Sequence, residues 1–135
     1  MERSGVDALT RSECMELLDQ ARVGRVGVSI DALPAILPVN FTLLDESILF
    51  CTVPGTSLAR AVAASVVAFQ VDSYDPAGST GWSVLAVGRA NEITEPTTLD
   101  RARSIPLDAW ALSTGADRFV CLETTRLSGR RHYRQ

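Results

Sequence analysis

The chain has 135 residues and a formal net charge of -3, with 46% hydrophobic and 21% charged residues. This length and composition indicate one soluble globular domain, over residues 1–135, with enough chain for a hydrophobic core. The acidic balance argues against broad nucleic-acid binding, which needs a basic face, and the absence of lysine excludes Schiff-base catalysis.

The first segment with a clear pattern is a helix near the N-terminus. Residues 1–9 carry little pattern and are expected to form a mobile arm or an extended segment. Thr10 and Glu13 fit a capping box that begins a helix. Apolar residues at helical spacing extend that helix over about residues 11–22, and Gly24 is expected to end it.

Strand signals dominate the rest of the chain. Alternating or β-branched segments predict six strands, at residues 25–30, 35–43, 48–52, 66–71, 82–93 and 118–127. Two short helices are predicted at about residues 57–65 and 97–104, and residues 105–117 are irregular. Strands and helices do not alternate as in βαβ folds. The pattern predicts a mainly β protein with some α: a six-stranded, mostly antiparallel barrel with two or three short helices.

The segment with the most chemistry is the junction from Thr52 to Arg60. It is predicted to be a strand end, a Pro-Gly turn and a helix start, with hydroxyls at Thr52, Thr56 and Ser57. A helix start offers unpaired N–H groups and partial positive charge, which suit a phosphate. The spacing is not that of a P-loop or of a dinucleotide fingerprint. An ordinary strand-turn-helix junction is the alternative interpretation.

Two strands carry further candidates. Asn40 is a polar residue in the apolar run Leu37–Phe41, where Pro38 indicates a sheet edge or a bulge. Such a strand could offer its backbone and amide to a flat heteroaromatic ring. In the strand at 82–93, Trp82 is either a core residue or a cofactor wall. Ser83 and Arg89 share one side of that strand, which would be unusual inside a barrel without something polar there.

Other reactive residues give weaker signals. His132 is the sole histidine and lies in a basic tail, which makes a histidine triad improbable. Asp72 and Asp75 suit loop caps better than a metal pair, and no metal is expected. The three cysteines are widely spaced and indicate neither a disulfide framework nor a zinc site. No segment resembles a signal peptide or a membrane span, so a cytoplasmic location without a membrane partner is expected.

Several motifs in order resemble one known family. They include Gly24–Val26, Leu37–Phe41, Pro54–Leu58 and Gly81–Ala90. Together they resemble the pyridoxamine 5'-phosphate oxidase-like proteins with the FMN-binding split barrel, over about residues 9–131. Within that family the chain is most similar to a short actinobacterial branch related to nitroimidazole reductases.

The resemblance implies a homodimer with FMN in a cleft between the subunits, and a small-molecule substrate. It implies that the phosphate lies near Thr52, Gly55, Thr56, Ser57 and Leu58, and that the flavin ring lies along Pro38, Val39 and Asn40. Trp82 and Ser83 would contact the cofactor, and Trp110 would approach it from the partner subunit. No residue is identified as catalytic, because the flavin carries the redox chemistry in such proteins.

One departure from the family pattern bears on the cofactor. Relatives commonly carry lysine where this chain has Ser57. Loss of a cation beside a phosphate removes about 1.5–3 kcal/mol, or roughly tenfold to a hundredfold in affinity. Arg60 is placed to compensate. The expected function is an FMN-dependent oxidoreductase. The alternatives are a non-catalytic or degenerate flavin-binding module, or a reductase that uses deazaflavin on the same fold.

Overall fold

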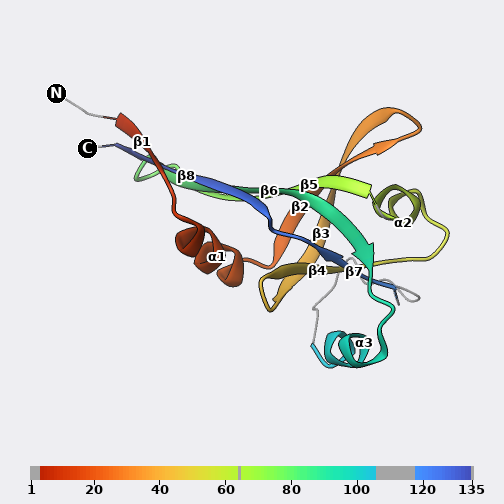
Figure 1. The fold of residues 1–135 in the computed structure, drawn as a ribbon. Helices are drawn as coiled ribbons and strands as arrows, with labels where there is room; N and C mark the ends of the chain where they lie inside the picture. The colour runs from red at the N-terminus through yellow and green to blue at the C-terminus, as the bar shows by residue number, and fades with distance from the viewer. Residues whose placement is uncertain (1–3, 64, 106–117, 135) are drawn as a thin grey trace.

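The computed structural model describes residues 4–63, 65–105 and 118–134, which form eight strands and three helices. The helices are α1 (Arg11–Gln20), α2 (Ser57–Val62) and α3 (Pro96–Arg103). The strands are β1 (Ser4–Ala8), β2 (Val23–Ile30), β3 (Leu33–Leu44), β4 (Ser47–Thr52), β5 (Ser65–Asp75), β6 (Thr80–Glu92), β7 (Arg118–Leu122) and β8 (Arg126–Arg134). Figure 1 shows the helices set around the sheet rather than between its strands.

Six strands close into an antiparallel barrel. The sheet order is β1-β8-β6-β5-β2-β3-β4-β7, and a further pairing of β6 with β7 joins the two ends of the six-strand run. The strand β6 takes part in both sheet edges: it pairs with β8 over Gly81–Val87 and with β7 over Ala90–Glu92, and the second pairing closes the barrel. The prediction of a mainly β, six-stranded split barrel with two or three short helices is confirmed.

Beyond the barrel, the sheet continues as a flat extension that we call the wing. It consists of β1, β8 and the parts of β5 and β6 between residues 72 and 83. Figure 1 shows the wing reaching away from the barrel, with both chain ends at its tip and α1 beneath it. The wing therefore adds sheet area without adding to the barrel interior.

The core forms where strand faces point into the barrel. Phe50, Phe69, Ile48 and Leu122 are among its fully buried side chains. The Phe41 and Phe69 rings meet edge to face, with centroids 4.9 Å apart. Gly24 is not the end of α1 but lies in β2, where a Cβ would come within 2.2 Å of the Phe69 ring. The helix ends earlier than predicted, at Gln20.

Helix ends are fixed by their own side chains. The capping box predicted at Thr10 and Glu13 is present, with hydrogen bonds of 2.8 and 3.2 Å. Thr56 caps α2. At α3 the cap is Glu95 and not a threonine: its carboxylate accepts from the backbone N–H groups of Thr97 and Thr98 at 3.0 and 2.7 Å. These hydrogen bonds lower the pKa of Glu95 to about 2.

A buried hydroxyl ties three parts of the chain together. Thr124, only 5% exposed, accepts a hydrogen bond from Arg11 Nη2 at 2.9 Å and donates one to the Glu46 carbonyl at 2.6 Å. Arg11 lies on α1, Glu46 in the β3–β4 turn and Thr124 between β7 and β8. The contact holds α1 against the barrel end.

Three further segments differ from the prediction, and α2 ends at Val62 rather than at about residue 65. The segment predicted as one strand at 118–127 is two strands, β7 and β8, broken at residues 123–125 because β7 pairs with β4 and β8 continues into the wing. Of the two alternatives for residues 1–9, an extended segment is observed: β1 pairs with β8. The loop predicted at 75–81 is shorter, because β5 and β6 remain paired out to Asp75 and Thr80.

Candidate functional site

The strand-turn-helix junction predicted from the sequence is present and exposed. β4 ends at Thr52 and α2 begins at Ser57. Gly55 between them has φ +83°, a conformation that favours glycine, and a Cβ there would meet nothing within 4 Å. The outer surface of the turn is therefore open to a ligand.

The three hydroxyls at this junction have different roles. Thr52 is buried at 3% exposure. The Thr56 hydroxyl caps α2, because it accepts from Ala59 N at 3.2 Å and donates to the Val53 carbonyl at 2.7 Å. Ser57 is exposed. Of the three, Ser57 is the hydroxyl best placed to meet a ligand.

A cation lies at the same turn. The Arg60 guanidinium folds back along α2, with Nη1 donating to the Gly55 carbonyl at 3.0 Å and Nη2 to Ser57 Oγ at 3.4 Å. The side chain remains exposed. Arg60 therefore places a positive charge beside the position where relatives commonly carry lysine.

The predicted ring-binding residues lie on a strand edge. β3 pairs with β2 over Leu33–Asn40, but its pairing with β4 begins only at Phe41. Within the described part of the chain, no strand pairs with the other side of β3 before Phe41. Pro38 thus lies at an edge, as expected for a residue without a backbone N–H. Val39 and Asn40 are buried, at 4% and 8% exposure.

The β3 edge and the turn converge. The β3–β4 register pairs Phe41 with Phe50, so two residues further on Val39 lies level with Thr52. Residues 38–40 and the residues leading into α2 therefore border the same gap, where β3 and β4 have ceased to pair. A flat ring could hydrogen-bond to exposed backbone here while its phosphate reaches the turn.

Trp82 and Ser83 do not point the same way. Neighbouring residues on a strand point to opposite faces. Trp82 shares the face of the core residues Val84 and Ala86, whereas Ser83 shares the outer face with Leu85, which is 40% exposed, and with Arg89. Ser83 and Arg89 thus share one side of β6, as predicted, and that side is the outer surface of the barrel rather than its interior.

A single chain keeps Trp82 away from the β3 edge. Trp82 pairs with Ser73, eight residues along β5 from Ser65, where α2 leads into the strand. At 3.2–3.4 Å per residue, Trp82 lies about 26 Å from the end of α2. Along the strand direction it is nearly level with Asn40, because Asn40 pairs with Val23, and the pairing of Arg25 with Gln70 places Val23 level with Asp72. Three strand spacings, roughly 14 Å, also separate β3 from β6. Trp110, the remaining predicted contact, lies outside the described residues.

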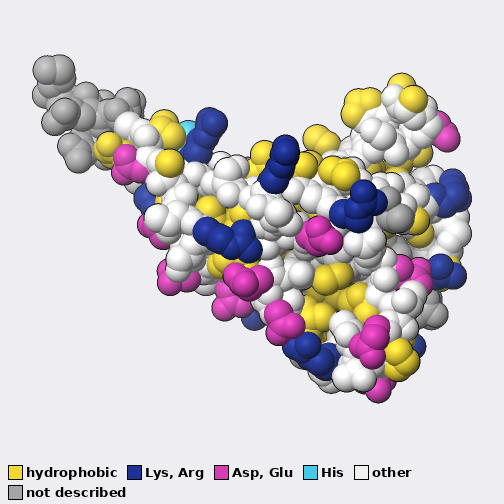
Figure 2. Space-filling model, viewed as in Figure 1, with side chains coloured by type: hydrophobic (Ala, Val, Ile, Leu, Met, Phe, Trp, Pro, Cys, Tyr) yellow, Lys and Arg dark blue, Asp and Glu magenta, His cyan; other side chains and the backbone are white. Residues whose placement is uncertain are grey.

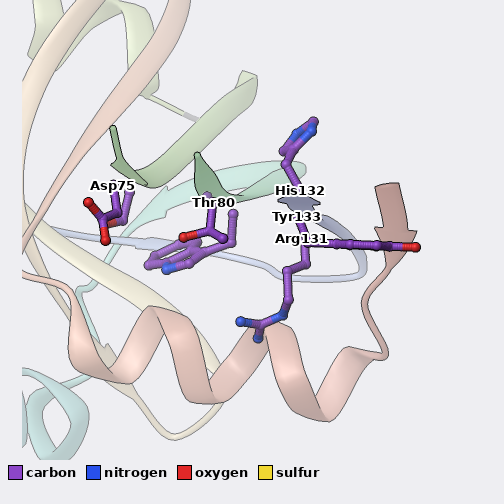
Figure 3. Close-up of a pocket in the computed structure, with 8 residues that line it drawn as sticks. Asp75, Thr80, Arg131, His132 and Tyr133 are labelled. Carbon is purple, nitrogen blue, oxygen red and sulfur yellow. The ribbon is translucent and has the colours of Figure 1, made fainter. Parts of the chain in front are cut away.

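The wing holds a cavity that the sequence patterns did not indicate. Its volume is about 380 Å³, and it is lined by Ser73, Asp75, Thr80, Gly81, Trp82, Arg131, His132 and Tyr133 (Figure 3). Residues 130–133 were interpreted as a basic tail and are in fact part of strand β8, and no apolar alternation in the sequence marks them as a strand.

Thiol chemistry is not indicated at either site. Burial raises the pKa of Cys121 on β7 and of Cys14 on α1, which keeps both thiols protonated at neutral pH. Among the described residues, no cluster of three or more His, Cys, Asp or Glu side chains is placed to hold a metal ion. No helix in the described ranges has the length and apolar character to cross a membrane.

Comparison with known proteins agrees with this architecture. Residues 10–131 match the pyridoxamine 5'-phosphate oxidase family. The uncharacterized protein Rv0080 of Mycobacterium tuberculosis is 35% identical over 126 residues, 90% of this chain and 82% of that protein. A structure described as the FAD binding protein from Mycobacterium smegmatis is 29% identical, with a TM-score of 0.81 over 95% of this chain and 98% of that one.

A second solved structure extends the likeness to another organism. A protein from Mesorhizobium loti described as FAD-binding is 27% identical, with a TM-score of 0.75 over 93% of this chain and 97% of that one. The family match spans most of the chain, and the barrel is the split barrel of that family. The chain therefore belongs to the pyridoxamine 5'-phosphate oxidase-like family of flavin-binding split barrels.

Proposed function

We propose that this protein binds FMN at the gap between the β3 edge and the β4–α2 turn and acts as a flavin-dependent oxidoreductase. The observation that carries the proposal is the convergence of Pro38–Asn40 with Thr52–Leu58 in a chain of this family. The open surface at Gly55, the exposed Ser57 hydroxyl and the Arg60 guanidinium fit a phosphate group.

The residues of the chain have distinct parts in this proposal. Arg60 and Ser57 hold the phosphate, and the unpaired edge of β3 orients the ring through its backbone. The apolar residues around Val39 exclude water from one ring face. When bound, a flavin supplies the transfer of a hydride or electrons, and so no side chain is required to act as a strong acid or base.

FMN is the cofactor that this site favours. The turn provides one cation, Arg60, which suits the terminal phosphate of a mononucleotide. Both solved structures compared above are described as FAD-binding, so FAD is the alternative that the experiment must separate. Deazaflavin, or no cofactor at all, are the remaining outcomes.

We further propose that two copies of the chain complete the site. Within one chain, three strand spacings, roughly 14 Å, separate Trp82 on β6 from the β3 edge, and in this proposal the second copy supplies the indole that contacts the ring. Exposed apolar side chains supply surface for that contact: Ile36 is 72% exposed and Val66 63%. Figure 2 shows apolar side chains exposed around the tip of the β2–β3 hairpin. By resemblance, Trp110 would also approach the cofactor from the partner.

The test begins with the absorbance spectrum of the protein as purified, followed by identification of any released cofactor. Bound FMN is expected to give a yellow protein, and added FMN is expected to raise the melting temperature. A colourless protein with no thermal shift on addition of FMN, FAD or deazaflavin would contradict the proposal. Turnover is then measured with reduced nicotinamide nucleotides and nitro-compounds.

A non-catalytic binding module is the second candidate, favoured by the Ser57 departure. Flavin binding without turnover of any of these substrates would support it. The oligomeric state is measured separately by light scattering, with and without FMN. A monomer that binds FMN at full affinity would contradict the two-copy site while leaving flavin binding intact.

A further inference from the structure

The cavity in the wing continues the core face of the sheet beyond the barrel. Ser73, Trp82 and Arg131 lie directly opposite one another on β5, β6 and β8, so their side chains share one face. One step towards the barrel, Val71 and Val84 occupy the same face and are buried at 3% and 1% exposure. The indole and the guanidinium therefore lie side by side just where the barrel core ends.

This register decides which side chains of β8 point towards the cavity face of the sheet. Figure 3 shows Arg131 and His132 on opposite sides of the strand, with Arg131 on the side of α1. Tyr133 turns towards β1, because its ring occupies the space that a Cβ of Gly5 would need. Arg131 is thus the cation that this cavity receives from β8.

Arg131 is available to a ligand. Within the described part of the chain its guanidinium makes no hydrogen bond or ion pair, although Asp7 lies directly opposite Arg131 on β1. Its charge adds weakly to the lowered pKa of Glu13, which is caused chiefly by hydrogen bonds from Thr10. A guanidinium with its donors unused is well suited to a phosphate, which it can contact through two parallel N–H groups.

The other residues that line the cavity offer a flat aromatic surface and a hydrogen-bond acceptor. The Trp82 indole is half-buried and offers a flat surface to an aromatic ring. Asp75 Oδ1 accepts from Ala77 N at 3.0 Å, which leaves its second oxygen as an acceptor beside Thr80. A volume of about 380 Å³ is near the lower end of ligand pockets and suits a ligand of mononucleotide size.

We propose that the wing cavity binds an adenine nucleotide, with the base against Trp82, its amino group towards Asp75 and a phosphate on Arg131. The residues of this site come from one chain, and it shares Trp82 with the proposed two-copy flavin site. The nucleotide has two sources: a free mononucleotide, or the adenylate half of FAD. The proposal does not depend on flavin binding at the β4–α2 turn.

The test compares adenosine 5'-monophosphate with adenosine by isothermal titration calorimetry. Arg131→Gln is the main variant, because Trp82 also belongs to the proposed flavin site. Arg130→Gln is the matched control: it removes the same charge from the adjacent residue, on the opposite face of β8. Circular dichroism checks that both variants keep the fold.

The wild type is expected to bind the monophosphate roughly tenfold to a hundredfold more tightly than adenosine, because of the charge-assisted contact. Arg131→Gln is expected to bind the monophosphate and adenosine with equal affinity. Arg130→Gln is expected to keep the wild-type preference for the monophosphate. The proposal fails if the wild type binds no monophosphate, or if the two variants bind it equally well.

The source is separated by titrating FAD and FMN. A preference for FAD over FMN that disappears in Arg131→Gln supports the adenylate of FAD as occupant. Equal affinities, together with monophosphate binding, support a free nucleotide. Loss of all flavin binding would overturn the proposed function and leave the monophosphate result standing.

Discussion

Gly88 is where the barrel closes, and alanine there should damage the closure. The residue lies on β6 between the stretch paired with β8 and the stretch paired with β7. A Cβ at this position would be 2.4 Å from the Glu123 carbonyl oxygen, which is backbone and cannot rotate away. The neighbouring hydrogen bond, from Glu123 N to the Arg89 carbonyl at 3.1 Å, holds the two segments together.

The cost follows from these two contacts. Overpacking a tight site costs about 1–3 kcal/mol, and a weakened backbone hydrogen bond adds about 0.5–1.5 kcal/mol. We therefore expect Gly88→Ala to lower the free energy of unfolding by about 2–4 kcal/mol. For a domain of this size the melting temperature should fall by roughly 10 °C.

Gly27→Ala is the matched control, measured by urea denaturation at the same chain concentration. Gly27 is also a strand glycine, but a Cβ there would be 3.5 Å from the Ala68 Cβ, an ordinary contact. Both changes remove similar freedom from the unfolded chain, so their difference isolates the contact. Gly27→Ala should change stability by less than about 0.5 kcal/mol. Equal stabilities of the two variants would refute the reasoning.

Three further predictions concern the phosphate, the Thr124 clamp and the α3 cap. Ser57→Lys should tighten FMN binding roughly tenfold to a hundredfold in a fluorescence titration. Ser12→Lys, which adds the same charge on α1, should leave the affinity for FMN unchanged. If Ser57→Lys also left it unchanged, the phosphate would have to lie elsewhere. Thr124→Val should cost about 1–3 kcal/mol in urea unfolding, because the two hydrogen bonds of the buried Thr124 hydroxyl, to Arg11 and to the Glu46 carbonyl, are lost at about 0.5–1.5 kcal/mol each. Thr125→Val, at an exposed site, should be nearly neutral. The pKa of Glu95 falls from 4.5 to about 2 on folding, so the ionised carboxylate should stabilise the folded state fully above pH 4.5 and lose this effect as pH falls towards 2. The measurement is the difference in free energy of unfolding between wild type and Glu95→Gln over this pH range. A difference that stays constant would contradict the prediction.

Local patterns were sufficient for the elements whose cause is local. The capping box at Thr10 lies within four residues, and the six barrel strands alternate clearly enough to be predicted. β8 was missed because its second half lies in the wing. There its inward positions are Gly129, Arg131 and Tyr133, so no apolar alternation marks the strand.

Alternation shows which residues share a face, but it does not show which face is covered. Ser83 and Arg89 were correctly placed on one side of β6, yet that side is the outer surface. The face is decided by strand order and barrel closure, which depend on pairings between residues far apart in the chain. The cavity beside Trp82 was hidden for the same reason, since it needs the register of β6 against β8.

The length of β5 links the fold to the proposed site. Eleven residues carry the strand from α2 through the barrel and out into the wing, where residues 72–75 are all exposed. Ordering an exposed strand costs conformational entropy that little burial offsets within one chain. Tyr74 and Val6, at 68% and 56% exposure, add apolar surface to the same wing. We therefore expect the wing to be stabilised by a second copy, which would carry Trp82 to the flavin ring at the partner's β3 edge.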